Sequence, residues 1–212
     1  MRLAFVLYKY FPFGGLQRDM LRIAEVCLQA GHQVRVYTMA WDGEVPAGLQ
    51  LELIEVRGMS SHARNREFSR QLQARLAEAP ADRVVGFNKM PGLSVYYAAD
   101  GCVREKLLAE RSWLSRLAPR YRHFLKYEEA VFSPTEKTEI LMISPRQKEI
   151  FVRHYGTPEA RIQMLPPGIA RDRMAGADDP ELRASFRREI GIGDEDRLIL
   201  CIGSGFKTKG LD

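Results

Sequence analysis

Cysteine is scarce in this sequence, and its cysteines lie far apart. The 212 residues contain three of them, Cys27, Cys102 and Cys201. An odd number at wide spacing supports neither a disulfide framework nor a metal-ligand pattern. The four histidines are dispersed as well, with no two at ligand spacing. We therefore expect a protein of a reducing compartment that has no metal site.

Long hydrophobic runs are also missing. Residues 3–8 form one of the longest, far below the roughly 18 residues that a spanning helix needs. The N-terminal run is also too short for a signal peptide. Because 45% of the residues are hydrophobic, the chain can still bury a core, which excludes a disordered protein. We expect a protein that starts and stays in the cytoplasm.

Acidic residues are outnumbered, and the imbalance is local. The chain carries 32 Lys and Arg against 27 Asp and Glu, a net charge of +5. Residues 104–126 hold seven basic and two acidic residues, so this segment alone accounts for the excess. Its leucines and aromatic residues keep helical spacing through a break at Pro119, which is typical of amphipathic helices on an anionic bilayer. A solvated helix pair packed by its apolar stripe is an equally good interpretation. The candidate membrane-binding residues are Arg104, Lys106, Arg111, Trp113, Arg116, Arg120, Arg122 and Lys126.

Strand-like segments alternate with helical periodicity along most of the chain. Residues 2–8 predict a strand, apolar residues spaced from Leu16 to Cys27 predict a helix that Gly31 ends, and residues 32–38 predict a second strand. Further strands are expected at 50–56, 83–88, 94–99, 137–143 and 161–165, and further helices at 63–79 and from Ser144 to Gly156. The predicted fold class is α/β, a doubly wound Rossmann-like parallel sheet. Ligand contacts are expected at the carboxyl ends of its strands.

The composition changes after residue 170. Residues 1–170 form the expected N-terminal domain, and residues 171–196 a polar linker with a helix at 181–190. Residues 197–202 then predict a buried strand, followed by a glycine turn. We interpret residues 197–212 as the start of a second Rossmann-like domain that the sequence does not complete.

The loop after the first strand is the first candidate ligand site. Gly14 and Gly15 let a backbone approach a ligand, and the helix behind them offers free N–H groups to phosphate or sugar oxygens. A tight strand-to-helix turn explains the same residues equally well. The third glycine of a dinucleotide fingerprint is absent. Asp19, in the predicted first helical turn, is interpreted more simply as a complement to the helix dipole.

The ends of two later strands form the second candidate. Asn88 and Asp100 each follow a predicted strand, where doubly wound folds place ligand contacts. Asp100 could instead cap the helix that follows it, and the residues alone favour that interpretation slightly.

Basic residues at the edge of each predicted domain form the third candidate. Arg171 and Arg173 follow a Pro-Pro-Gly-Ile motif at 166–169, and Lys207 and Lys209 lie near the C-terminus. Facing each other across a cleft, they would neutralise a diphosphate. The alternative is that they are ordinary solvated surface charges.

Three motifs carry a resemblance to a known family. They are residues 9–19 (KYFPFGGLQRD), 83–93 (RVVGFNKMPGL) and 165–169 (LPPGI). With them the chain resembles the retaining GT-B glycosyltransferases of family 4, and in particular the lipopolysaccharide core glucosyltransferases of Gram-negative bacteria. The resemblance extends over the whole chain.

The resemblance implies two Rossmann-like domains facing a cleft, the first binding the acceptor and the second UDP-glucose. Glucose would pass with retention, in an α-1,3 linkage and without a metal, to the heptose of a lipid-anchored core oligosaccharide at the anionic inner-membrane surface. Gly14 and Gly15 would approach the donor, whose phosphates Arg173 and Lys209 would bind. Asp19 and Asp100 would line the cleft as candidate catalytic residues.

The sequence departs from the family pattern in two ways. Thr208 stands where the family has a basic residue, with Lys207 beside it, and the C-terminal Glu-containing donor motif is absent. We therefore expect this chain alone to be inactive, because most of the cations and N–H groups that stabilise the departing UDP are missing.

Two other function classes compete with this interpretation. The basic segment would suit a nucleic-acid-binding module, but no aromatic RNA motif or recognition-helix pattern accompanies it, so nucleic acid is not an expected partner. A nicotinamide-dependent oxidoreductase would suit the strand-turn-helix start, but the missing third glycine weakens it.

Overall fold

The structure is a computed structural model that describes residues 1–110, 118–168, 180–193 and 195–200. The chain divides into two compact units, Met1–Pro167 and Gly168–Asp212. The candidate residues that the structure describes all lie in the first unit.

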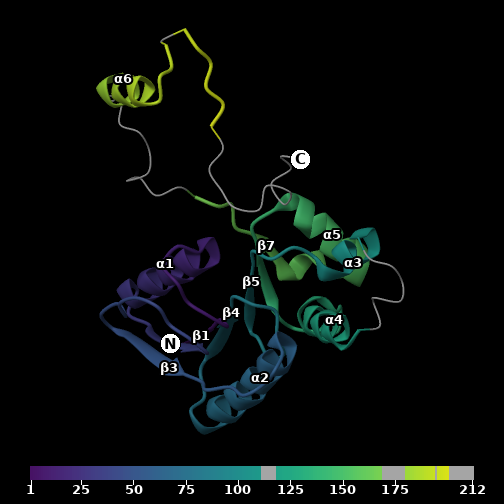
Figure 1. Ribbon diagram of the computed structural model, residues 1–212. Helices are drawn as coiled ribbons and strands as arrows, with labels where there is room; N and C mark the ends of the chain where they lie inside the picture. The colour runs from purple at the N-terminus through teal and green to yellow at the C-terminus, as the bar shows by residue number, and fades with distance from the viewer. Residues whose placement is uncertain (111–117, 169–179, 194, 201–212) are drawn as a thin grey trace. The chain divides into compact units, whose positions relative to one another are not determined.

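A seven-stranded parallel sheet forms the centre of the first unit (Figure 1). The strands lie in the order β3-β2-β1-β4-β5-β6-β7, and every neighbouring pair is parallel. The order reverses between β1 and β4, the switch point at which doubly wound folds bind ligands. The strands are β1 (Arg2–Val6), β2 (Gln33–Thr38), β3 (Leu49–Leu53), β4 (Arg83–Gly86), β5 (Val95–Ala98), β6 (Glu139–Met142) and β7 (Ile162–Met164). The predicted α/β fold class is confirmed.

Helices cover both faces of this sheet (Figure 1). The helices of the first unit are α1 (Gly15–Gln29), α2 (Ser61–Glu78), α3 (Val103–Glu110), α4 (Pro119–Phe132) and α5 (Pro145–Tyr155). Met20 of α1 packs with Phe5 and Phe87 in the core of one face. The core of the other face contains Phe132 of α4 and Phe151 of α5, whose rings stack at 3.7 Å between centroids. Successive strand residues point to opposite faces, so β1 contributes to both cores.

Local signals predicted the helix ends well. Gly31 has φ +79°, and its N–H donates to Leu28 O while that of His32 donates to Cys27 O, which is a Schellman ending. The Ser144 hydroxyl accepts from the N–H of Gln147, as expected of an N-cap ahead of Pro145. Both signals are confirmed because each depends only on residues close in sequence.

One predicted strand is wrong within the described residues. Residues 197–200 belong to no strand, and Ile199 is 95% exposed. A strand needs a neighbour for its N–H and C=O groups, and the described part of the unit Gly168–Asp212 contains no strand to pair with. The helix predicted beside it is present as α6 (Pro180–Glu189). Residues 201 and 202 of the predicted strand lie outside the described part.

Candidate functional site

A crevice of about 330 Å³ opens at the carboxyl end of the sheet. It lies beyond β1, β4 and β5, next to the switch point, and α2, α3 and α4 contribute to its walls. Its lining residues are Tyr8, Asn65, Asn88, Lys89, Asp100, Gly101, Val103, Phe124 and Tyr127. Polar groups from three strand ends therefore converge on one hollow, as the fold class predicts.

The crevice exists because β1 and β4 end two residues before their predicted ends. Beyond Val6 and Gly86 the chain leaves the sheet, which frees Tyr8 and Asn88 to line the hollow. The Tyr8 N–H donates to Asn88 Oδ1 at 2.8 Å. This bond joins the two strand ends across the switch point and fixes the floor of the crevice.

A buried ion pair holds the wall that carries Asp100. Lys89 Nζ lies 2.7 Å from Glu128 Oε2 and donates to Gly101 O at 2.7 Å. The Glu128 side chain is fully buried. Lys89 therefore ties the loop after β5 to helix α4, and the position of Asp100 depends on this link.

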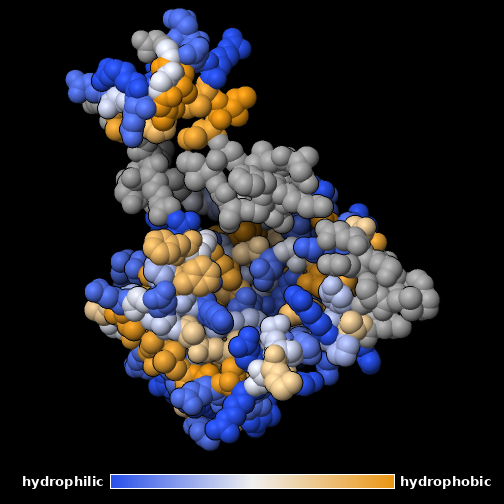
Figure 2. Space-filling model, viewed as in Figure 1, coloured by the Kyte–Doolittle hydropathy of each residue, from blue (hydrophilic) through white to orange (hydrophobic). Residues whose placement is uncertain are grey.

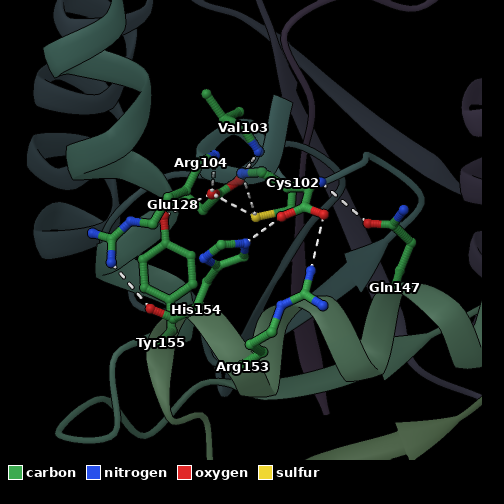
Figure 3. A network of polar contacts seen from close by, with 9 residues as sticks. Cys102, Val103, Arg104, Glu128, Gln147, Arg153, His154 and Tyr155 are labelled. Carbon is green, nitrogen blue, oxygen red and sulfur yellow. Dashed lines mark hydrogen bonds and ion pairs between the residues drawn. The ribbon is translucent and has the colours of Figure 1, made fainter. Parts of the chain in front are cut away.

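Glu128 also accepts hydrogen bonds from the start of α3 (Figure 3). Its carboxylate accepts the N–H groups of Val103 at 2.8 Å and Arg104 at 3.0 Å, the Tyr155 hydroxyl at 2.6 Å and the Cys102 thiol at 3.3 Å. Burial raises the pKa of this carboxyl, but Lys89 and the hydrogen bonds outweigh burial, so the pKa lies below its usual value. A stable buried anion thus satisfies the helix N-terminus.

The interpretation of Asp100 as a helix cap is wrong. Helix α3 begins at Val103, and its first N–H groups go to Glu128, whereas the Cys102 N–H goes to Gln147 Oε1 at 3.2 Å. Asp100 remains on the crevice wall, and its carboxylate has no hydrogen-bond partner in the part of the chain that the structure describes. Burial and the nearby Glu128 raise its pKa, although Lys89 acts in the opposite direction.

Asp19 lies outside this crevice. Helix α1 begins at Gly15, so Asp19 is beyond the first turn and does not complement the helix dipole there. Its Oδ2 accepts the Tyr97 hydroxyl at 2.8 Å. Tyr97 is on β5, and burial together with this bond raises the pKa of the phenol. The two candidate carboxylates therefore adjoin the same strand but do not line one cavity.

The paired glycines have different roles at the start of α1. Gly14 is the N-cap residue, and a Cβ there would collide with Gln17 Oε1. The buried Gln17 side chain donates to Lys9 O at 3.1 Å and closes the loop. A Cβ on Gly15 would meet open space. Among the residues that the structure describes, no side chain caps α1, and no acid lies in its first turn, so the N–H groups there can receive an anion.

The predicted membrane-binding residues have unlike surroundings. Lys106, Arg120, Arg122 and Lys126 are exposed. The Arg104 guanidinium instead packs 4.2 Å from the Tyr155 ring centroid and donates to His154 O at 3.0 Å. Candidate residues outside the described part are Arg111, Trp113, Arg116, Arg171, Arg173, Lys207 and Lys209. Within the described part, no helix is long and apolar enough to cross a membrane.

Sequence reasoning missed the residues that hold the site together. Lys89 directly follows Asn88, so its place at a strand end could have drawn attention. Glu128 has no such signal, because its partners lie 24 to 39 residues away in sequence. Among the described residues, no group of three or more His, Cys, Asp and Glu could hold a metal ion.

A comparison with protein families now assigns the chain. The model of Glycosyltransferase Family 4 matches residues 13–173, which include Gly14, Gly15 and every residue that lines the crevice except Tyr8. The chain belongs to glycosyltransferase family 4.

The chain is similar in sequence to two proteins of known name. The chain is 47% identical over 212 residues to lipopolysaccharide glucosyltransferase WaaG of Escherichia coli K12, a match covering 100% of this chain and 57% of the relative. Over 73 residues it is 33% identical to a GDP-mannose-dependent alpha-(1-6)-phosphatidylinositol monomannoside mannosyltransferase of Mycolicibacterium smegmatis, which covers 34% of this chain and 18% of that protein. The chain thus spans little more than half the length of the Escherichia coli relative.

Solved structures agree with the fold. The crystal structure of WaaG superposes with a TM-score of 0.89 at 47% identity, covering 99% of this chain and 56% of that one. A sucrose-phosphate synthase from Thermosynechococcus elongatus superposes with a TM-score of 0.60 at 13% identity, covering 92% of this chain and 53% of that one. The second likeness supports the fold alone.

Proposed function

We propose that this chain is the acceptor-binding part of a retaining glycosyltransferase of lipopolysaccharide core synthesis. The reaction would transfer glucose from UDP-glucose, in an α-1,3 linkage and without a metal ion, to a heptose of the lipid-anchored core oligosaccharide. The observation that carries the proposal is the 47% identity to a lipopolysaccharide glucosyltransferase along the entire chain.

The crevice offers groups suited to a sugar acceptor. Asp100 and Asn88 present carboxylate and amide oxygens to a hollow that also contains the rings of Phe124 and Tyr127. Sugar hydroxyls donate to such oxygens, and apolar ring faces fit their C–H groups. Because the Asp100 carboxylate has no hydrogen bond of its own among the described residues, a bound hydroxyl would supply one.

The donor would meet the start of α1. A UDP leaving group gains negative charge as the glycosidic bond breaks, and free N–H groups at an uncapped helix start stabilise such charge. Arg173 and Lys209 are proposed to add cations. Asp19 is proposed to contact the reacting sugar, with its carboxylate oriented by Tyr97.

The test is an assay of the protein at its full natural length. Labelled UDP-glucose is supplied with heptose-terminated lipopolysaccharide, and linkage analysis identifies the product. We expect α-1,3-glucosyl heptose, no requirement for a divalent ion, and loss of transfer in Asp100→Asn. No transfer of glucose under these conditions would contradict the proposal.

We also propose a cytoplasmic location, peripheral on the inner membrane. The exposed Lys106 and Arg120 support it, because cations near an anionic surface contribute about 1 kcal/mol each. In flotation with phosphatidylglycerol vesicles, the double variant K106Q/R120Q should bind less than the parent. Equal binding of the two proteins would argue that the acceptor alone localises the enzyme.

A further inference from the structure

A second hollow lies between α2 and α4, outside the crevice. It has a volume of about 930 Å³. Figure 2 shows hydrophilic side chains gathered over the region where these two helices lie. The lining contains five cationic side chains and one carboxylate, namely Arg66, Arg70, Arg104, Arg122, Lys126 and Glu129. We refer to this hollow as the α2–α4 groove.

Most of the positive charge in the α2–α4 groove is not neutralised. Arg70 pairs with Glu67 at 2.6 Å, and Arg104 packs on Tyr155. Arg66, Arg122 and Lys126 form no ion pair within the residues that the structure describes. Three exposed cations from two helices thus face one hollow. Like charges repel, so an arrangement of this kind gains stability when an anion binds.

The positive charges in the groove help to lower the pKa of one histidine in its lining, His123. The His123 ring lies 4.0 Å from the Tyr127 ring between centroids, and its Nε2 is buried without a hydrogen-bond partner among the described residues. Burial, with His62, Arg66 and Lys126 nearby, lowers the pKa of His123 to about 4. Other charged groups facing it are Arg122 and Glu129 in the groove lining. At neutral pH the ring is therefore uncharged, and its Nε2 is buried without a partner among the described residues.

The α2–α4 groove adjoins the acceptor crevice. Asn65 lines the crevice and Arg66 the groove, and the same holds for Phe124 and His123 on α4. Tyr127 lines both hollows. A saccharide seated in the crevice could therefore extend an attached group into the groove without crossing the sheet.

The chemistry of the lining favours a phosphate monoester. Guanidinium groups bind phosphate oxygens through paired hydrogen bonds, and a dianion offers enough acceptors for cations from two helices. A hollow of this size suits a group carried on a small molecule, since ligand pockets span roughly 300–1,000 Å³.

We propose that the α2–α4 groove binds a phosphate monoester carried by a saccharide, through Arg66, Arg122 and Lys126. That this saccharide is the acceptor rests on the proposed function, whereas the binding itself does not.

The test is calorimetric titration of the 212-residue chain with mannose 6-phosphate, with mannose as the neutral probe. R66Q/R122Q removes one groove cation from each helix. Its matched control, R64Q/R146Q, removes two exposed arginines that lie outside the groove. We expect R66Q/R122Q to bind mannose 6-phosphate at least tenfold more weakly than the parent, and R64Q/R146Q to bind it with the parental affinity. The two variants should not differ in their affinity for mannose.

Several outcomes would overturn the proposal. These are a parent that binds mannose 6-phosphate no better than mannose, equal losses in the two double variants, or a groove variant that loses only phosphatidylglycerol vesicle binding. Circular dichroism checks the fold, and R66K/R122K, which keeps the charge but loses the paired hydrogen bonds, should bind mannose 6-phosphate more weakly than the parent and more tightly than R66Q/R122Q. Glucosyl transfer is measured separately in the full-length protein, so failure of transfer with intact phosphate binding counts against the proposed function alone.

Discussion

At the scale of single residues, the crevice depends on one buried carboxylate. Glu128 accepts from Lys89, from two backbone N–H groups of α3, from Tyr155 and from Cys102. Replacing a partner in a buried ion pair leaves an uncompensated charge, which costs more than the pair itself contributes. The surroundings of Lys89 and the start of α3 both depend on this group.

Glu128→Gln should lower the free energy of unfolding by about 3–5 kcal/mol, because Lys89 stays buried without its counterion. Urea denaturation followed by circular dichroism measures the change. Glu129→Gln is the matched control: this neighbour is exposed, and its substitution should alter stability by less than about 0.5 kcal/mol. Similar losses in both variants would show that the ion pair does not dominate.

Substitution of Asp100 should stabilise the protein, which is the opposite of the effect expected for Glu128→Gln. The pKa of Asp100 is raised in the folded protein, so the stability that it contributes is present at low pH and lost as the pH rises through that pKa. Asp100 is exposed, so solvent screens its charge and the effect at pH 7 should be small: Asp100→Asn should increase the unfolding free energy by about 0.5 kcal/mol or less, while reducing glucosyl transfer. The exposed Asp42→Asn is the control for stability. A destabilised Asp100→Asn protein would contradict this electrostatic account.

At the scale of elements, helices α1 and α3 satisfy their N-termini in different ways. Glu128 accepts the first N–H groups of α3, whereas α1 begins at a glycine, and no side chain in the described part of the chain caps it. A filled helix start has a structural role, and an open one can bind a ligand. This contrast is why the donor phosphates are proposed at α1.

The two glycines at the start of α1 should respond differently to alanine. Gly14→Ala would displace Gln17 from its bond to Lys9 and place a poor N-cap residue, costing about 1–2 kcal/mol. Gly15→Ala enters open space at a helical position and should be neutral or stabilising by up to about 1 kcal/mol. Thermal unfolding of both variants tests the difference. In a Gln17→Ala background the cost of Gly14→Ala should shrink, and an unchanged cost would implicate the backbone instead.

At the scale of the whole molecule, acid should destabilise the first unit. The pKa of His123 is lowered to about 4, and that of Glu128 is lowered too. A group whose pKa is lowered by folding contributes stability above its unfolded value, and this stability is lost as the pH falls through the folded value. The histidine contribution should disappear between about pH 6.5 and pH 4.

His123→Phe should flatten the pH dependence of stability between pH 6.5 and pH 4. The variant keeps an aromatic ring beside Tyr127 but cannot take up a proton. Because the ring is partly exposed, we expect the parent to lose only about 1 kcal/mol more than the variant over this interval. Urea denaturation at several pH values measures both curves, and parallel curves would exclude His123 as the group responsible.

Features of this chain that depend on neighbouring residues could be predicted from the sequence, whereas features that depend on distant residues could not. The strand and helix order, the Gly31 ending and the Ser144 cap were predicted correctly because each follows from adjacent residues. The Asp100 cap and the strand from residue 197 were wrong, since the first depended on a competing side chain on α4 and the second on a neighbouring strand. The catalytic, donor-binding and membrane-binding assignments stay predictions.

The sequence by itself determined the α/β class, the helix ends and the concentration of positive charge between residues 104 and 126, because periodicity, capping and charge are readable along the chain. Only the tertiary structure decided that Glu128 holds the wall bearing Asp100 and that Arg66 and Arg122 line one groove. It also decided that Asp19 accepts a hydrogen bond from Tyr97 and does not complement the dipole of α1. The physical reason is that these contacts join residues 39 to 78 positions apart, or helices separated by two strands, and parallel crossovers alone bring them together.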